Sequence, residues 1–167
     1  MILGMSTAAF TLFHVILSLI GIAAGGVVAL GLRSARALPG WTLLFLITTV
    51  ATSVTGFFFH SLVFGPPHVV GVISLIVLAV GIFALYVRHL KGAWRWIYVT
   101  SALVALYLNV FVGVVQAFQK LPVLHQLAPN GSEPPFAVAH LLVLGLFVWL
   151  GIVCVKRFHP SFADAPA

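Results

Sequence analysis

Carboxylate side chains are almost absent from this sequence of 167 residues, which contains only Glu133 and Asp164. The membrane spans predicted below place these two residues on opposite sides of a bilayer. A pair of carboxylates that act together as acid and base is therefore excluded. A chain of carboxylates that relays protons across the membrane is excluded for the same reason.

Cysteine is nearly absent as well, because Cys154 is the only one. A single thiol excludes an intrachain disulfide, a CxxC redox pair and a zinc site built from several thiolates. The sequence also lacks the GxxxxGKS/T phosphate loop, the HExxH metalloprotease motif and the GxSxG nucleophile turn. Several common classes of nucleotidase and hydrolase are therefore disfavoured.

Charged residues of both signs make up only 6% of the chain, whereas a soluble domain carries about a quarter. Hydrophobic residues make up 62%, and the mean hydropathy is +1.22. Such a chain has too little polar surface to cover a water-soluble globule. The composition predicts an all-α, polytopic membrane protein with the lipid bilayer as its surroundings.

Five long apolar stretches predict a bundle of five transmembrane helices, formed by a single domain over residues 1–157. The predicted spans lie near residues 5–32, 41–64, 68–90, 96–118 and 136–155. Proline, glycine and basic residues interrupt the apolar stretches and mark the connections between spans. Residues 158–167 are expected to form a short disordered cytoplasmic tail.

The basic residues predict how the bundle is oriented. One side of the predicted topology carries Arg33, Arg36, Arg88, Lys91, Arg95, Lys156 and Arg157. Only Lys120 falls on the other side. Because cytoplasmic loops retain Lys and Arg, we expect the amino terminus outside and the carboxy terminus inside, in a bacterial inner membrane. The formal charge of +6 is thus explained by topology, and no nucleic-acid partner is expected.

Histidines gather on the predicted outer side, which holds five of the seven. The five are His14, His60, His68, His125 and His140. Three of them lie within predicted spans, and His60 and His140 are each about 6 Å below the outer edge of the hydrocarbon. His68 begins the third span. His125 lies in residues 121–127, a predicted amphipathic segment that covers the bundle as a lid.

Helical spacing indicates that His14 and His60 face protein and not lipid. His60 continues a polar stripe with Thr48, Thr52 and Gly56, and His14 begins a similar stripe of small residues. Polar side chains in a span turn toward other helices because lipid offers no hydrogen bonds. The sequence therefore predicts a histidine-lined pocket near the outer surface, beneath residues 121–135.

We expect the predicted pocket to bind a redox cofactor, and haem b is the first hypothesis. A b-type haem needs axial histidines from different helices and no thioether cysteines. His14 with His60 or His140 meets these demands, with His68 and His125 in reserve. The protein would then pass electrons between a quinone and an outer acceptor. The second hypothesis is a transition-metal ion held by His14, His60 and His140, with Glu133 as a fourth ligand.

Other interpretations need no cofactor. The histidines would then only form hydrogen bonds between helices, His60 with Thr52 and His14 with Ser18 or Asn109. In that case the chain is a non-catalytic accessory or assembly subunit of a larger membrane complex, or one copy of a homo-oligomer. A third possibility is a channel for a small neutral solute, lined by Thr48, Thr52 and Asn109.

Overall fold

The computed structural model describes residues 2, 4–59 and 65–159. These residues are helical except for the connections and one isolated bridge between Ile2 and Met5, so the all-α prediction is confirmed for the described residues. The elements in chain order are α1 (Thr7–Arg33), α2 (Pro39–Gly56), α3 (Pro66–Ile82), the π-helical segment η1 (Phe83–Val87), α4 (Trp94–Lys120), α5 (Pro122–Leu127) and α6 (Pro134–Arg157).

The helices begin at residues whose chemistry favours a helix start. The Ser6 side chain accepts a hydrogen bond of 3.2 Å from the amide of Ala9 and caps α1. Proline in the first turn begins α2, α3 and α6. Proline suits this position because its fixed φ is helical and an amide there has no helical partner. The predicted breaks at Pro39, Pro66 and Pro134 therefore lie at helix starts.

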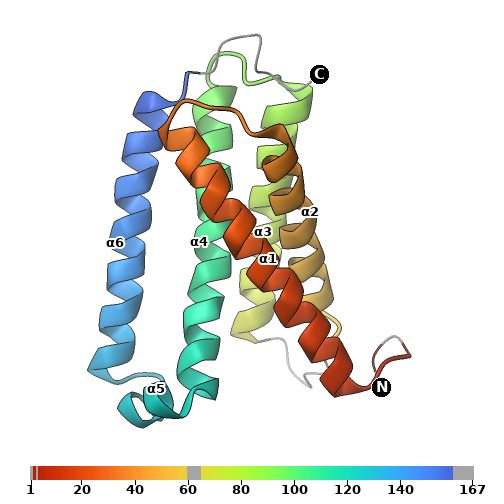
Figure 1. Cartoon of the computed structure of the whole chain (residues 1–167), viewed down its shortest axis with the longest axis vertical. Helices are drawn as coiled ribbons and strands as arrows, with labels where there is room; N and C mark the ends of the chain where they lie inside the picture. Colours follow the sequence, from red (N-terminus) through yellow and green to blue (C-terminus); the bar gives the residue numbers. More distant parts are fainter. Residues whose placement is uncertain (1, 3, 60–64, 160–167) are drawn as a thin grey trace.

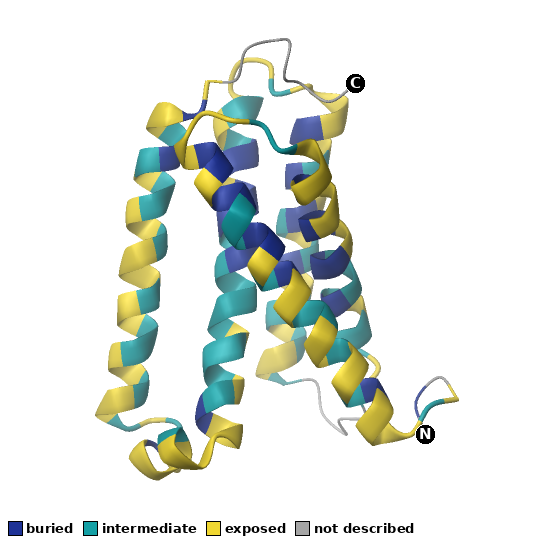
Figure 2. Ribbon diagram, in the orientation of Figure 1, coloured by how far each residue is buried: buried dark blue, intermediate teal, exposed yellow. Residues whose placement is uncertain are grey.

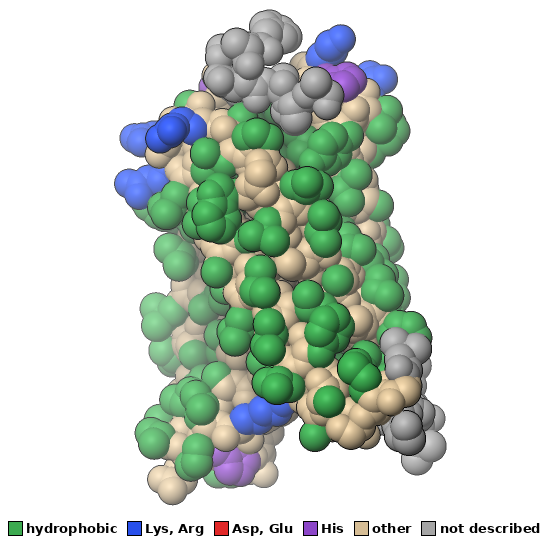
Figure 3. Space-filling model, turned by 45° about the vertical axis from the view of Figure 1, so that its right-hand side comes forward, with side chains coloured by type: hydrophobic (Ala, Val, Ile, Leu, Met, Phe, Trp, Pro, Cys, Tyr) green, Lys and Arg blue, Asp and Glu red, His purple; other side chains and the backbone are tan. Residues whose placement is uncertain are grey.

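The long helices run up and down along a common axis, and α1 crosses the others obliquely (Figure 1). The α1–α2 connection, the η1–α4 connection and the end of α6 lie at one end of the bundle. We call this the basic end. It carries Arg33, Arg36, Arg88, Lys91, Arg95, Lys156 and Arg157. Figure 3 shows blue side chains gathered there on a mostly green surface.

The opposite end holds the start of α1, the start of α3, and the α4–α6 connection with α5 (Figure 1). Lys120, at the end of α4, is the one basic residue of this end among those described. We call it the histidine end, since α5 and the first turns of α3 and α6 bring His125, His68 and His140 there.

Four helical segments are long and apolar enough to cross a membrane, namely α1, α3 with η1, α4 and α6. This finding indicates an integral membrane protein. The four segments agree with predicted spans to within three residues at each end. Helix α2 is not among these four segments. Its 18 residues include five threonines and a serine, which make it less apolar.

The predicted length of the second span is wrong. Helix α2 ends at Gly56, and residues 57–59 form a turn and a bend, whereas the span was expected to continue to residue 64. The expected stripe of Thr48, Thr52, Gly56 and His60 therefore leaves the helix after Gly56. His60 itself lies outside the described residues.

The tail predicted from residue 158 is also wrong at its first residue, because Phe158 is buried. One guanidinium nitrogen of Arg95, Nη1, donates to the carbonyl of Val155 at 3.0 Å and to that of Phe158 at 2.5 Å. The last carbonyls of a helix have no helical partner, and a cation there satisfies them. Residues 160–167 lie outside the described part of the chain.

The core lies toward the basic end (Figure 2). Apart from Phe10, the buried residues of α1 lie between Gly21 and Leu32. At the crossing with α2 and α4, a Cβ on Gly25 would lie 2.5 Å from Leu106 Cδ1 and 2.9 Å from the Phe45 ring. Glycine is therefore needed at this position because the helices approach too closely for any side chain.

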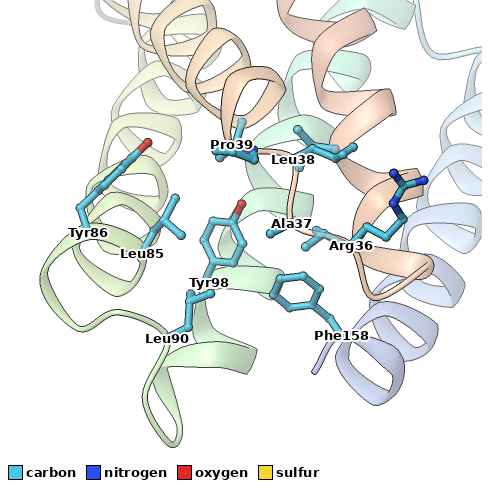
Figure 4. A pocket seen from close by; sticks show the side chains of 12 residues that line it. Arg36, Ala37, Leu38, Pro39, Leu85, Tyr86, Leu90, Tyr98 and Phe158 are labelled. Atoms are coloured by element: carbon cyan, nitrogen blue, oxygen red, sulfur yellow. The ribbon is translucent and has the colours of Figure 1, made fainter. Parts of the chain in front are cut away.

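A small cavity of about 20 Å³ remains at the basic end, lined by Tyr98, Leu85 and Phe158 among others (Figure 4). The Tyr98 and Phe158 rings lie side by side there, with centroids 6.3 Å apart, and Arg36 extends away from them. This volume accommodates about one water molecule. We therefore interpret the cavity as a packing feature and not as a binding site.

Candidate histidine site

Four of the five predicted outer histidines are described, and they lie on four different helices. They are His14 on α1, His68 on α3, His125 on α5 and His140 on α6. The chemistry available to each depends on which ring nitrogen carries the proton. In a neutral imidazole the protonated nitrogen donates a hydrogen bond, and only the other nitrogen has a lone pair for a metal ion.

The hydrogen bonds of Thr55 determine the protonation of His14. His14 Nδ1 lies 2.8 Å from Thr55 Oγ1, and the Thr55 hydroxyl donates to the carbonyl of Ala51 at 2.7 Å. Because the only hydroxyl proton is directed to Ala51, Oγ1 must accept from the ring N–H of His14. His14 Nε2 therefore carries the lone pair. The Phe59 ring packs against the imidazole with centroids 5.1 Å apart.

His140 has the same protonation for a different reason. Its Nδ1 lies 2.9 Å from the carbonyl oxygen of Phe136, and a carbonyl only accepts, so Nδ1 donates. Nε2 then carries the lone pair, and this buried atom has no hydrogen-bond partner among the described residues. Metal-ligating histidines usually donate their other ring N–H to such a carbonyl or to a carboxylate. His140 is therefore oriented and protonated as a ligand would be.

Two phenylalanines hold the His140 ring in place. Phe111 of α4 lies edge-on to it, with ring centroids 4.6 Å apart, and the centroid of Phe136 lies 4.3 Å away. Aromatic walls of this kind exclude water and restrict the rotamer of the ring. An unpaired acceptor in such surroundings costs about 1–3 kcal/mol, which a ligand on Nε2 would offset.

His68 has the opposite protonation. The amide of Gly65 donates to His68 Nδ1 at 3.2 Å, so the neutral ring carries its proton on Nε2. The imidazole thereby accepts from the amide of the N-cap residue at the start of α3. This arrangement favours a structural role for His68, although the sequence placed it among the reserve ligands.

Glu133 is committed to its own loop. Its Oε1 accepts from the backbone amide of Asn130 at 3.0 Å and from Asn130 Nδ2 at 2.9 Å, and its Oε2 accepts from the amide of Ser132 at 3.0 Å. These bonds, the Asn130 backbone bond most of all, hold the pKa of the Glu133 carboxyl below its usual value. Glu133 would have to leave these partners to bind a metal ion.

The described members of the predicted metal site do not assemble. Helices α1 and α6, which carry His14 and His140, diverge toward the histidine end (Figure 1). Within the described ranges, no three His, Cys, Asp or Glu side chains form a group that could hold a metal ion. His60, the remaining predicted ligand, lies outside these ranges.

A cavity of about 280 Å³ lies beneath α5, where the sequence predicted a pocket under residues 121–135. Of the described histidines, only His125 lines it. His140 is not part of the lining, but Phe136 lines the cavity and also packs against the His140 ring.

Most of the remaining predicted polar contacts are packing contacts. Thr48 donates to the carbonyl of Leu44 at 2.7 Å, and Asn109 Nδ2 donates to Thr49 Oγ1 at 3.3 Å. Gly21 fits against them so closely that an added Cβ would lie 3.2 Å from Thr49 Oγ1. The predicted channel lining of Thr48 and Asn109 is thus filled at this level of the bundle.

Two of the predicted hydrogen bonds involve His60 and His14. Thr52 Oγ1 is buried and has no partner among the described residues, so the predicted bond between His60 and Thr52 stays a prediction. The predicted bond from His14 to Ser18 or Asn109 is wrong, since its partner is Thr55.

The sequence interpretation missed three residues of the histidine surroundings, namely Thr55, Phe111 and Phe136. Phe136 precedes His140 by four residues, and this helical spacing indicates that both share a face. Thr55 and Phe111 reach their histidines from other helices, and nothing in the local sequence identifies such a contact.

Comparison with known proteins adds no family to this description. No protein-family model, no curated protein and no solved structure matches the chain. A function for this chain has therefore to be inferred from the geometry of its histidine end.

Proposed function

We propose that this chain is an integral protein of the bacterial inner membrane that binds a redox cofactor at its histidine end. Haem b is the preferred cofactor, and a transition-metal ion is the second choice. The protein exchanges electrons between a quinone and an acceptor outside the membrane. His140 supplies one ligand, and His14 and His60 are the other candidate ligands.

The observation that carries this proposal is the buried lone pair of His140 Nε2, which has no partner among the described residues. Its ring is held by a hydrogen bond from Nδ1 to the Phe136 carbonyl. The same hydrogen bond from the second ring nitrogen orients histidines that bind metals in proteins. Haem iron accepts such an imidazole as an axial ligand, and the hydrophobic walls around it suit a cofactor of low polarity.

His14 supports the proposal independently. Its bond to Thr55 leaves Nε2 as the lone-pair nitrogen, and Phe59 brings the chain that leads to His60 close to its ring. Haem is preferred over a mononuclear ion because haem iron needs only one or two protein ligands. An ion would need three or four, and no such group forms among the described side chains.

The proposed topology has five spans with the amino terminus outside. Helix α2 has 18 residues and would extend about 27 Å, close to the roughly 30 Å of the hydrocarbon core. Its polar residues face protein, since Thr48, Thr49 and Thr52 are buried. The concentration of Lys and Arg at the basic end supports a cytoplasmic position for that end.

The test is an absorption spectrum combined with elemental analysis of the same detergent-purified sample. We expect a Soret band with stoichiometric iron, or another stoichiometric transition metal. The variant His140→Ala should lose most of the bound cofactor while it keeps its helical circular dichroism. His159→Ala is the matched control, because His159 is an exposed histidine at the basic end.

Two outcomes would contradict the proposal. A purified protein with neither a Soret band nor a stoichiometric metal has no cofactor of the proposed kind. A His140→Ala protein that retains the full cofactor content of wild type does not use this ligand. In either case a non-catalytic accessory subunit becomes the better interpretation. Helix α6 fits that role as well, because Cys154 is its only buried residue among those described.

A further inference from the structure

We infer that the cavity beneath α5 binds the ring of a quinone. This inference deepens the proposed function by locating its electron-exchanging substrate, and it rests on that function for the role of the quinone. The cavity lies between the end of α4, α5 and the start of α6. Its lining includes Val115, Phe118, Gln119, His125, Asn130 and Phe136.

Two aromatic rings form the apolar walls of the cavity. Phe118 is buried, and its ring meets that of Phe136 edge to face with centroids 5.4 Å apart. Flat conjugated ligands stack well against such walls. The cavity therefore suits a flat ring better than a branched aliphatic group.

Polar side chains border the same cavity. Gln119 and His125 contribute an amide and an imidazole to its lining, and Asn130, whose Nδ2 already donates to Glu133, adds its amide oxygen. Amides and imidazoles both donate and accept hydrogen bonds. They can therefore bind the carbonyl oxygens of a quinone and the hydroxyl groups of a quinol. Few polar groups on largely apolar walls are typical of small-molecule sites.

The volume limits the size of the ligand. About 280 Å³ is just below the usual range of roughly 300–1,000 Å³ for ligand pockets. A single substituted ring, or a fused pair of rings, fits this space, but the macrocycle of haem does not. The cavity is therefore distinct from the proposed cofactor position at His140.

The position of α5 provides access from the membrane. Large apolar side chains are exposed on and beside α5. The exposed fraction is 53% for Leu121, which precedes the helix, 73% for Val123 and 52% for Leu127. A short helix with such a surface at the end of a membrane bundle lies in the interfacial layer of the bilayer. A ligand with an apolar tail can reach the cavity from lipid while its polar ring lies near the surface.

Phe136 connects the cavity to the proposed cofactor ligand. It lines the cavity, and its ring centroid lies 4.3 Å from that of His140. A quinone ring in the cavity would therefore contact a phenylalanine that itself packs against the His140 imidazole. The small gap at the basic end differs in both respects, because it is far from His140 along the bundle and accommodates only about one water molecule.

The experiment is a calorimetric titration of decylubiquinone into the full chain in nanodiscs, with empty nanodiscs as the blank. We expect saturable binding by the wild type. Gln119→Leu and His125→Leu each remove a hydrogen-bonding group and should raise Kd about five- to tenfold. Val115→Trp fills the cavity and should abolish binding. Gln116→Leu is the matched control, because Gln116 lies on α4 outside the lining and should bind like wild type.

Several results would overturn the inference. Binding no stronger than in empty nanodiscs excludes the site, and equal affinities for all four variants place the quinone elsewhere. Displacement of the quinone by added phosphatidylglycerol would assign the cavity to a lipid headgroup.

The titration is also independent of the proposed function, because it does not need a bound cofactor. If the protein lacks haem and metal but binds the quinone in this cavity, the proposed function is wrong and this inference stands. If the protein binds haem but the substitutions leave its Kd for the quinone unchanged, the proposed function stands and this inference is wrong.

Discussion

The two ends of this bundle differ in packing and in chemistry. At the basic end, α1, α2 and α4 approach closely enough to require Gly25, and the remaining gap is about 20 Å³. At the histidine end, α1 diverges from α6 and a cavity of about 280 Å³ remains. The buried Nε2 atom of His140 has no hydrogen-bond partner there among the described residues. The comparison indicates that one end stabilises the fold and the other is available for ligands.

The physical reason for the difference is the distribution of small and polar residues. Gly25 leaves room for the side chains of Leu106 and Phe45 to pack directly against α1, so van der Waals contacts accumulate around it. Polar residues near the other end bond to one another or to carbonyls, as Thr55 does with His14. Ligand sites are commonly found in the less stable parts of a protein, because binding requires open space and unpaired groups.

The largest effect is expected at Gly25. Gly25→Ala places a methyl group against Leu106 and the buried Phe45 ring. The free energy of unfolding should therefore fall by about 2–3 kcal/mol. Gly26→Ala is the matched control, because a Cβ there meets nothing within 4 Å. Denaturation in detergent, followed by circular dichroism, compares the two. Equal stabilities for both variants would show that the basic end is not the tightly packed half.

A smaller effect is expected at Arg95, which binds the carbonyls of Val155 and Phe158. Arg95→Met keeps the length of the side chain but removes the donor, and should weaken the attachment of the tail by roughly 1–2 kcal/mol. Limited trypsin cleavage near Lys156 and Arg157 should become faster. Arg88→Met is the control, because Arg88 is exposed and lies over the ring of Trp94. Unchanged cleavage in the Arg95 variant would contradict the prediction.

The smallest effect is expected at Glu133, in the exposed loop of the histidine end. Its carboxyl pKa is lowered by hydrogen bonds, first among them that from the Asn130 amide. The folded-state pKa is below the unfolded one, so the loop bonds are fully present above the unfolded pKa. They are lost as the pH falls through the folded pKa. Amide hydrogen exchange at Asn130 and Ser132 should therefore lose protection only in acid.

Glu133→Gln provides the control for this pH dependence. The amide cannot ionise, so protection at Asn130 and Ser132 should be weaker near neutral pH and should not change with acid. Exchange rates that depend on pH equally in both proteins, after correction for intrinsic exchange, would remove Glu133 from this role.

Much of the fold followed from the sequence, and the candidate site followed only in part. Four apolar segments, the breaks at Pro39, Pro66 and Pro134 and a short amphipathic segment around His125 were predicted from local residues. The structure begins a helix at each of these prolines and forms α5 over that segment. The length of the second span was predicted wrongly. An apolar run that includes Phe57 and Phe59 continues past Gly56, but the chain turns there, and hydropathy does not report a turn.

The site required information from other helices. That His140 donates to Phe136 was accessible in principle, because the two residues are four apart on one helix. That His14 donates to Thr55 was not, since 41 residues separate them and Thr55 lies on α2. The predicted convergence of His14 and His140 also depended on helix crossing angles, which no local pattern specifies.

Composition and the order of residues were enough to predict a helical chain with apolar segments long enough to cross a membrane, the breaks between them and the gathering of basic residues at one end. These properties depend on the transfer of each segment between water and lipid, which is a sum over neighbouring residues. Only the tertiary structure decided which ring nitrogen of each histidine is protonated, where the helices separate and where a cavity remains. Those properties depend on side chains that are distant along the chain and meet only after the helices have packed.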